Sequence, residues 1–353
     1  MKVCFMGTPD FAGVILKSLL TKHDVTLVVT QPDRVNGRGG KVTVSDVKAI
    51  ATEQGIPVFQ PERIKRPEAI EELKKYDFDI IVVAAFGQIL PPAILDMPKF
   101  GCVNVHASLL PKYRGAAPIQ WAVINGDPVT GVTTMQMGPG LDDGDILEQK
   151  EVPIAADETG GGLFDKLALA GGDLILETLA GLEAGTITPV KQDEAKATHV
   201  GMIRKEMGNL DFTKSAAELE RLVRGLNPWP SAYTFLDGKM LKIWKAEDIS
   251  ALPSEAAGAG ADSSDSHEED GNGRGTVEKT GRQFEKSVSA RVPGTIVRAG
   301  DEVFAATGDG FLKLVEVQLE GKKRMTMSDF LRGHDLPAGL VLSANRTPAG
   351  TKS

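Results

Sequence analysis

The sequence predicts two domains: a doubly wound, mostly parallel, Rossmann-like α/β domain followed by an OB-like β-barrel. Three observations lead to this fold class. The chain has 353 residues, which is enough for two domains. Its first 190 residues alternate short apolar runs with helical patterns, as in a parallel sheet covered on both faces. Its last third contains alternating strands separated by tight turns, as in a small barrel.

Nearly continuous apolar runs and helical periodicity define the elements of the first domain. We expect strands at Lys2–Met6, Val25–Thr30, Ile80–Ala85, Cys102–His106 and Val132–Met137. We expect helices at Phe11–Leu20, Asp46–Gln54, Pro67–Tyr76, Pro118–Asn125 and Gly162–Ala184. Because ligands bind at the carboxyl ends of strands in such sheets, the residues that end these strands are candidates for a site.

The second domain begins with a helix signal and continues as strands. Ser215 and Glu218 form a capping box before an apolar helical run, and the segment Asn227–Pro230 ends that helix. Strands are then expected at Ala232–Leu236, Leu241–Ala246, Gly294–Arg298, Glu302–Thr307 and Phe311–Gln318, with a closing helix at Thr326–Arg332.

The domain boundaries follow from these patterns. We expect a catalytic domain at 1–190, a polar linker at 191–208, a barrel at 209–335 and a C-terminal tail at 336–353. The stretch from about 253 to 290 is rich in small and acidic residues with few large apolar ones, which predicts a disordered surface insertion.

Composition favours a cytoplasmic protein. No apolar run is long enough to span a membrane, and the first residues look like a strand and not like a signal peptide. Cys4 and Cys102 lie in apolar strands and are expected to be buried thiols. The net charge of −8 argues weakly against a nucleic-acid partner, although the C-terminal part is mildly basic outside the acidic stretch 251–290.

The strand Cys102–His106 carries the strongest chemical signal. Asn104 and His106 are two residues apart, so both side chains point to the same face of the strand. An amide can stabilise an oxyanion while an imidazole moves a proton, which is a pairing typical of acyl transfer. Asp142, in an acidic turn downstream, could orient the histidine. We therefore predict Asn104, His106 and Asp142 as catalytic residues.

Other interpretations of these residues stay open. His106 alone could be a satisfied core histidine. Asp142, Asp143 and Asp145 could together bind a hard cation, but no recognisable metal-binding loop surrounds them, and we predict no metal. The loop Ser108–Pro111 could line a ligand cleft or simply pack against the domain.

Two glycine-containing segments are candidate anion or substrate contacts. The turn Gly7–Gly13 joins the first strand to a helix, but it lacks the glycine spacing of a dinucleotide site and the lysine of a P-loop. The long loop Gln31–Lys48 combines glycines with basic residues that suit phosphates, Arg38 and Lys41 among them. The turn could equally be an ordinary strand–helix turn, and the loop taken alone is better explained as a solvated loop.

Five segments resemble one family over nearly the whole chain. They are FMGTPDFAG at Phe5–Gly13, TQPDR with GRGGK at Thr30–Lys41, NVHASLLPKYRGAAPIQWAVINGD at Asn104–Asp127, GVTTMQMGPGLDDGDIL at Gly131–Leu147 and LNPWPSA at Leu226–Ala232. The central segments resemble folate-dependent formyltransferases, and GTPDF, the GRG loop and NPWP are similar to the members that act on methionyl-tRNA. Asp143, Gly138 and Pro139 depart from the usual pattern, as does the length of the insertion.

The resemblance implies an activity and roles for individual residues. The activity is transfer of formyl from 10-formyltetrahydrofolate to the α-amino group of methionine on initiator methionyl-tRNA. The implied catalytic residues are Asn104, His106 and Asp142. Folate contacts fall on Ser108, Leu109, Leu110 and Pro111, and tRNA contacts on Arg38 and Lys41. The barrel would help to dock the tRNA, and the resemblance implies a monomer.

Three other functions remain as alternatives. The first is a folate-dependent formyltransferase for a small amine, such as a purine-pathway ribonucleotide or an amino sugar, which would not need the GRG loop or the barrel. The second is a non-catalytic RNA-binding protein, against which the intact catalytic set argues. The third is a nicotinamide-dependent dehydrogenase, which the missing dinucleotide glycine pattern disfavours.

Overall fold

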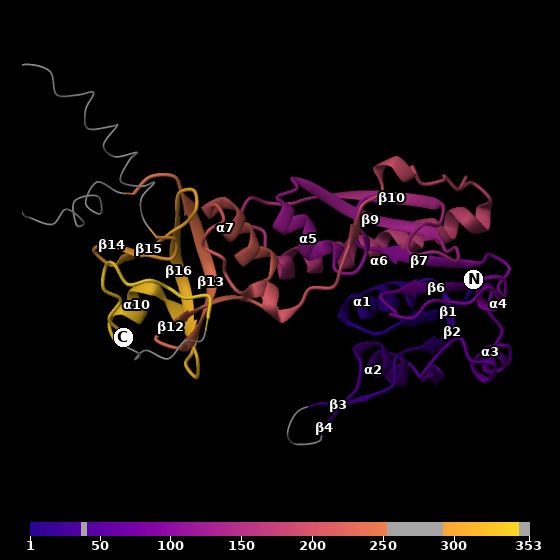
Figure 1. The fold of residues 1–353 in the computed structure, drawn as a ribbon. Coiled ribbons are helices and arrows are strands. Elements are labelled where there is room, and N and C mark those ends of the chain that lie inside the picture. The colour runs from indigo at the N-terminus through magenta and orange to yellow at the C-terminus, as the bar shows by residue number, and fades with distance from the viewer. Residues whose placement is uncertain (37–40, 253–291, 346–353) are drawn as a thin grey trace, which may run out of the picture. The chain divides into compact units, whose positions relative to one another are not determined.

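A computed structural model describes residues 1–36, 41–252 and 292–345 of the chain (Figure 1). The chain divides into two compact units. The N-terminal unit comprises Met1–Ala122 and Asp127–Met202, and the C-terminal unit comprises Val123–Gly126 and the chain from Ile203 onward. The predicted insertion at about 253–290 lies outside the described residues.

The N-terminal unit alternates strands and helices. In chain order its elements are β1 (Lys2–Gly7), α1 (Asp10–Leu19), β2 (Asp24–Val29), β3 (Arg34–Asn36), β4 (Lys41–Thr43), α2 (Asp46–Glu53), β5 (Val58–Phe59), α3 (Pro67–Leu73), β6 (Ile80–Ala84), α4 (Pro92–Leu95), β7 (Cys102–His106), β8 (Arg114–Gly115), α5 (Pro118–Asn125, which reaches into the second unit), β9 (Val129–Gln136), β10 (Ile146–Pro153), α6 (Gly160–Ala184), η1 (Glu194–Lys196) and β11 (His199–Val200).

Seven of these strands form one sheet in the order β10-β9-β7-β6-β1-β2-β5. The five strands from β7 to β5 are parallel, whereas β9 runs antiparallel to β7 and β10 antiparallel to β9. The strand order changes direction between β1 and β6, which is the switch point where such sheets bind ligands. The predicted doubly wound, mostly parallel sheet is confirmed.

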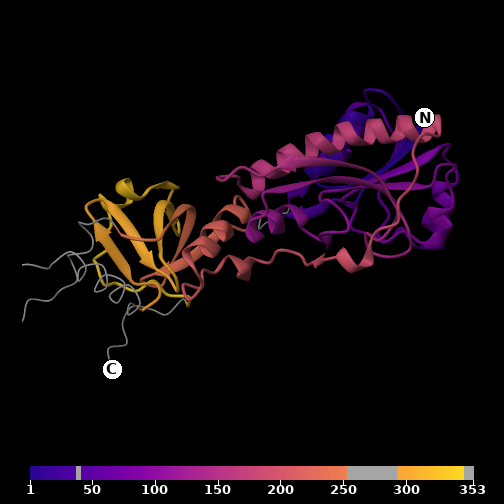
Figure 2. The ribbon, with the colours of Figure 1, turned by 90° about the horizontal axis from the view of Figure 1, so that it is seen from above.

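Alternating side chains explain why both faces of this sheet are covered. Cys4 and Met6 of β1 join an apolar cluster with α3 and α4 on one face. On the other face, α6 packs against α1, β9 and β10, and Gly171 of α6 lets Ile15 and Val105 approach closely. Figure 2 shows α6 running along the sheet. Burial on both faces accounts for the continuously apolar strands that the sequence shows.

Two strands of the sheet were not expected from the sequence. β10 is an edge strand that alternates exposed and partly buried side chains, and the polar residues of ILEQKEVP hid its pattern. β5 is only two residues long. The two cysteines are buried free thiols, as predicted, and burial raises the pKa of each, that of Cys102 to about 12.

In its described residues, the C-terminal unit is a small antiparallel sheet with the helices α7 and α10 and the short helix η2. Its elements are η2 (Lys205–Gly208), α7 (Ala216–Gly225), β12 (Ala232–Leu236), β13 (Lys239–Ile249), β14 (Ile296–Ala299), β15 (Glu302–Ala306), β16 (Phe311–Leu319), β17 (Met325–Thr326) and α10 (Met327–Leu331). The strand order is β12-β13-β16-β15-β14, with β17 beside β16. The predicted capping box of Ser215 and Glu218 begins α7.

Residues that the sequence analysis assigned to a C-terminal tail pair with both edges of this sheet. Val341 forms a bridge with Thr295 just before β14, and Ser343 forms one with Phe235 of β12. Leu336 and Leu342 are buried in the apolar core of the unit. The segment 336–345 is therefore part of the barrel, because it connects the two edge strands that the five-strand order leaves open.

Within the described ranges 1–36, 41–252 and 292–345, none of the helices is both long enough and apolar enough to cross a bilayer. The longest, α6, carries glycines and charged residues along its length.

Replacing a buried side chain of the closing segment tests its contribution to the barrel. Leu342→Ala should lower the free energy of unfolding by about 2–5 kcal/mol, because Leu342 is 3% exposed and its removal leaves a cavity. Unfolding in guanidinium chloride measures the change in free energy, and hydrogen exchange of the barrel amides shows whether the barrel is where stability is lost. Val341→Ala is the matched control, since Val341 is 49% exposed. Equal, small losses for both variants would mean that the segment only rests on the barrel.

Candidate active site

A cavity of about 800 Å³ opens at the carboxyl ends of the central strands. All the residues that line it belong to the N-terminal unit. They come from the turn after β1 with the start of α1, the loop after β6, the end of β7, β8 with the start of α5, the turn after β9, α6, and the end of β11 with the residues after it. The lining is mainly apolar, with a few polar groups on one wall. Such a cavity suits a flat organic ligand with a polar edge.

Asn104 and His106 of β7 both face this cavity, as their spacing predicted. Their side chains are almost completely buried by the protein. Among the described residues no hydrogen bond involves the side chain of Asn104, so its amide is free to meet a ligand. His106 is fixed, because its Nε2 lies 2.9 Å from the carbonyl oxygen of Tyr113.

This contact determines which nitrogen of His106 can react. A carbonyl oxygen only accepts hydrogen bonds, so Nε2 must carry a proton and donate it to Tyr113. The other nitrogen, Nδ1, lies 3.8 Å from Oδ2 of Asp142. This is an ion-pair distance and too long for a hydrogen bond. A neutral His106 therefore presents its lone pair at Nδ1, and a protonated His106 is paired with the carboxylate.

Asp142 is held by the backbone of a neighbouring loop. The amide of Gly115 donates a hydrogen bond of 2.8 Å to Oδ2 of Asp142. Asp142 itself has a φ of +51°, a left-handed backbone conformation that residues other than glycine adopt at a cost in free energy. The same turn passes so close to β9 that a side chain at Gly144 would collide with the carbonyl of Gln136. The turn is thus shaped to deliver one carboxylate to His106.

The structure brings the three predicted catalytic side chains to one wall but does not bring Ser108–Pro111 into the cavity. Ser108 is fully buried and donates to the carbonyl of Lys112. The hydroxyl of Thr133 donates to Ser108 and accepts the amide proton of Leu110, which anchors this segment to β9. Of the residues around it, only His106 and Ala107 border the cavity.

The predicted basic loop is described only at its base. Arg38 lies outside the described residues, and nothing is described of the Lys41 side chain. At the base, Lys48 pairs with Asp33 at 2.5 Å, and Gln31 donates to the carbonyl of Phe86 at 3.0 Å. The loop therefore starts from a point that is hydrogen-bonded to the cavity wall.

Sequence reasoning missed the loop after β6, which forms much of the apolar wall. Phe86, Ile89 and Leu90 line the cavity, and Ile89 is largely exposed at its mouth. Across from them, Phe11 and Phe164 pack edge to face, with ring centroids 5.8 Å apart. The apolar residues that directly follow the buried strand β6 were the available signal, because strand ends at the switch point form ligand sites.

It also missed a polar network behind Asp142. Arg114 is 3% exposed and forms two hydrogen bonds with the carboxylate of Glu194, at 3.0 and 2.7 Å. Its Nε donates to Gln192, which in turn donates to two carbonyls of the acidic turn. Gln192 and Glu194 belong to the predicted linker 191–208, whose polar sequence gave no sign of this packing.

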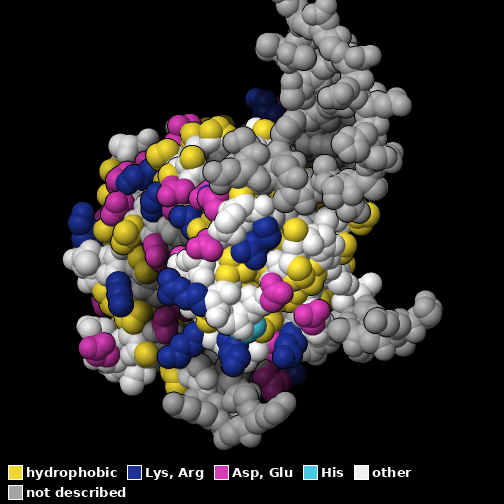
Figure 3. Space-filling model, turned by 90° about the vertical axis from the view of Figure 1, so that its left-hand side faces the viewer, with side chains coloured by type: hydrophobic (Ala, Val, Ile, Leu, Met, Phe, Trp, Pro, Cys, Tyr) yellow, Lys and Arg dark blue, Asp and Glu magenta, His cyan; other side chains and the backbone are white. Residues whose placement is uncertain are grey.

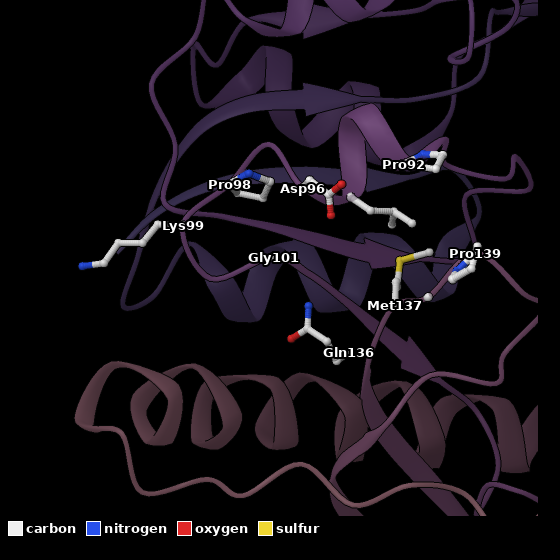
Figure 4. Close-up of a pocket in the computed structure, with 10 residues that line it drawn as sticks. Pro92, Asp96, Pro98, Lys99, Gly101, Gln136, Met137 and Pro139 are labelled. Carbon is white, nitrogen blue, oxygen red and sulfur yellow. The ribbon is translucent and has the colours of Figure 1, made fainter.

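A second, open cavity of about 520 Å³ lies beside the first (Figure 4). It is bordered by α4, the start of β7 and the end of β9, and it shares Met137 and Gly138 with the larger cavity. Gln136, which borders it, donates to the carbonyl of Cys102. In the described part of the chain, no three His, Cys, Asp or Glu side chains converge as a metal site would require.

Two family patterns match the chain and together cover most of it. The pattern described as Formyl transferase matches residues 1–179, and the pattern described as Formyl transferase, C-terminal domain, matches residues 202–335.

Curated relatives align over almost their entire length. A methionyl-tRNA formyltransferase of Lachnospira eligens is 52% identical, with 97% of this chain and 99% of the relative covered. One of Agathobacter rectalis is 50% identical, with 96% and 98% covered. One of Caldanaerobacter subterraneus is 44% identical, with 97% and 100% covered.

Solved structures share the fold at low identity. An N-formyltransferase of Helicobacter canadensis, in complex with folinic acid and dTDP-3-aminofucose, has a TM-score of 0.58 at 17% identity, and 89% of this chain and 98% of that chain are covered. HypX of Aquifex aeolicus in complex with tetrahydrofolic acid has a TM-score of 0.53 at 15% identity, and 94% and 47% are covered.

The pair of Arg114 and Glu194 predicts a pH dependence of stability. The hydrogen bonds from Arg114 lower the pKa of Glu194 from its ordinary value of 4.5. The stability that the pair adds is therefore complete above about pH 4.5 and is lost as the pH falls through the lower pKa of the folded state. Glu194→Gln should lower Tm at neutral pH, and its difference from the wild type should shrink below about pH 4.5.

Thermal unfolding of the wild type and Glu194→Gln between pH 7 and pH 3 measures this difference. Glu68→Gln, on the exposed side of α3, is the control and should show no such convergence. A Glu194→Gln deficit that stays constant down to pH 3 would contradict the assignment.

Proposed function

This chain belongs to the formyl transferase family, and on that premise we propose that it transfers a formyl group from 10-formyltetrahydrofolate to the α-amino group of methionine on initiator methionyl-tRNA. The product is N-formylmethionyl-tRNA, which serves translation initiation. The observation that carries the proposal is the convergence of Asn104, His106 and Asp142 on one wall of one cavity.

The attacking group must first lose a proton. An α-amino group has an ordinary pKa of about 7.7–8.0, so near neutral pH a large fraction is protonated and unreactive. His106 presents the lone pair of Nδ1 and can take this proton before the amine attacks. Asp142 lies 3.8 Å from that nitrogen and stabilises the resulting positive charge. His106 and Asp142 thus act as a pair that manages one proton.

The attack then places negative charge on the formyl oxygen. The amine nitrogen bonds to the formyl carbon. The bond from that carbon to the donor nitrogen then breaks, and the proton that the amine nitrogen loses passes to the donor nitrogen, so that tetrahydrofolate leaves. The side chain of Asn104 lies next to His106 on the same face of β7 and can donate an N–H to the oxyanion. The reaction needs no covalent bond to the protein.

The cavity suits the donor in size and in polarity. Its volume of about 800 Å³ accommodates a drug-sized ligand, and Phe86 and Leu90 offer apolar contacts for a flat ring. Donor binding by Ser108, Leu109, Leu110 and Pro111 stays a prediction, because in this structure these residues lie behind Ala107 and not on the cavity wall.

The same cavity has a corner that suits a methionine side chain. Phe11 and Phe164 form its aromatic surface, and Met202 lies at its edge, largely exposed. A thioether contacts aromatic rings favourably, by roughly 0.3–1.5 kcal/mol. A methionyl group bound there would lie in the same cavity as His106.

Recognition of the tRNA is assigned to the basic loop and the barrel. We propose that Arg38 and Lys41 contact the acceptor end, because basic side chains suit its phosphates. The barrel face in Figure 3 carries Lys and Arg side chains interspersed with acidic ones, so docking there would use individual contacts and not a uniform basic field. A monomer in the cytoplasm fits this proposal.

Loss of the imidazole tests the reaction and its centre together. His106→Ala should lower the rate of formyl transfer from 10-formyltetrahydrofolate to methionyl initiator tRNA by at least ~10²-fold, because the proton acceptor is removed. Rates are measured with purified wild type and variant, with folding checked by circular dichroism. If the folded wild type transfers no formyl group to the tRNA, the tRNA assignment fails and small amines with the same donor become the substrates to assay.

Loss of the loop arginine tests the tRNA contact. Arg38→Ala should lower kcat/KM for methionyl-tRNA by about tenfold or more, because a charged contact is worth roughly 1.5–3 kcal/mol. The Kd for the folate donor should not change. Steady-state kinetics with tRNA varied, together with calorimetric donor binding, separates the two. Lys65→Ala, at an exposed position before α3, is the control; tRNA kinetics in Arg38→Ala that match it would remove the loop from recognition.

A further inference from the structure

We propose that Gln192 is a positioning residue that fixes the carboxylate of Asp142 against His106. The inference rests on the proposed function, since it assigns Asp142 its role in proton transfer. Gln192 itself does not line the cavity. It acts through the backbone of the acidic turn between β9 and β10 and through Arg114.

Both N–H donors of the Gln192 amide and its oxygen are used. Its Nε2 donates to the carbonyl oxygen of Asp142 at 2.8 Å and to that of Gly144 at 2.7 Å. Its Oε1 accepts from Nε of Arg114 at 3.0 Å. This orientation of the amide is the only one its partners allow, because both carbonyls only accept and the guanidinium only donates.

Arg114 ties the same network to the other side of Asp142. The next residue, Gly115, donates its amide proton to the Asp142 carboxylate. Arg114 is held in turn by its two bonds to Glu194, which raise the pKa of its guanidinium, and the charges of Asp143 and Asp142 act in the same direction. Gln192 therefore joins the turn that carries the carboxylate to the loop that orients it.

The backbone pairing around Gln192 makes this arrangement rigid. β11 runs parallel to β8 and pairs His199 with Arg114 and Val200 with Gly115. The amide of Arg114 donates to Thr198, and a side chain at Gly115 would collide with the carbonyl of Val200. On the other side of Gln192, Val190 forms a bridge with Ile146 of β10, so the segment is fastened both before and after Gln192.

Asp142 needs such support because its conformation is unfavourable. Its φ of +51° lies in the left-handed region, which Asp and Asn adopt more readily than most residues but still at a cost, and its carbonyl accepts a hydrogen bond from Gln192. Without the two donors of Gln192, the turn is free to relax and carry the carboxylate away from its 3.8 Å separation from Nδ1 of His106. A displacement of about 1 Å in such a site can cost about 10²-fold in rate.

The test compares two substitutions of Gln192 that remove different sets of its hydrogen bonds. Gln192→Met keeps the size but removes every hydrogen bond. Gln192→Glu keeps the acceptor for Arg114 but places a carboxylate oxygen against the carbonyls of Asp142 and Gly144. Both should lower kcat for formyl transfer to methionyl-tRNA by about 10–100-fold, with KM for tRNA and donor within about threefold of the wild type. Activity retained in Gln192→Glu would show that the bonds to the turn are dispensable.

A double-mutant cycle separates positioning from general stability. Asp142→Asn removes the carboxylate charge, and asparagine tolerates the same backbone conformation. If Gln192 acts through that carboxylate, Gln192→Met should cost less than about threefold when Asp142→Asn is already present, measured in single turnovers with excess enzyme. A full additional loss of 10–100-fold would overturn the proposal.

Thr178→Val is the matched control for lost buried hydrogen bonds. Thr178 of α6 is fully buried, and its hydroxyl contacts Thr134, Glu148 and the carbonyl of Leu174, away from the cavity. It should lower Tm while kcat stays within about twofold. If Gln192→Met behaves like Thr178→Val, Gln192 is only structural. If the wild type itself transfers no formyl group to the tRNA, the proposed function fails. That outcome is distinct from a failure of the Gln192 proposal, in which the wild type is active and Gln192→Met matches Thr178→Val.

Discussion

The active site depends on one hydrogen bond, from the amide of Gly115 to the carboxylate of Asp142. It joins Gly115 of β8 directly to the turn after β9, two segments that Gln192 also connects through Arg114. β7 presents Asn104 and His106, and the turn after β9 presents Asp142. The bond brings the carboxylate to the nitrogen of His106 that is not already bonded to Tyr113. The hydrogen bonds of Gln192 and Arg114 hold the two segments in the positions that this contact requires.

Several residues around the cavity adopt conformations that cost stability. Ala85, Tyr113, Ala117 and Asp142 all have positive φ values although none is a glycine. Three of them line the cavity, and Tyr113 provides the carbonyl that fixes His106. Each such residue costs on the order of 1–3 kcal/mol, which the surrounding packing must offset. A seven-stranded sheet with helices on both faces provides that packing, so the loops can be shaped for chemistry.

The sequence predicted those parts of the protein that depend on local periodicity. The two-residue repeat of a strand sufficed to place Asn104 and His106 together, and buried strands and helices were found because their patterns are long. Gln192 could not be found in this way, because its role depends on contacts with residues about 50 and 78 positions earlier in the chain. A local pattern can also mislead. The residues Ser108–Pro111 directly follow His106 in the sequence, yet their side chains do not line the cavity. The pairing of 340–343 with both barrel edges was likewise a long-range contact.

The attachment of residues 191–201 to the catalytic loops has a consequence for how this protein can be divided. The three proposed catalytic side chains all lie before residue 143, and the last helix of the sheet, α6, ends at Ala184. A minimal enzyme designed by cutting after that helix would contain all three of them. It would lack the glutamine and the strand that hold the acidic turn, and it would expose Arg114 without its counter-ion. The catalytic module therefore ends after the segment 191–201, which holds the acidic turn in place. This is about 17 residues beyond Ala184, where α6 ends.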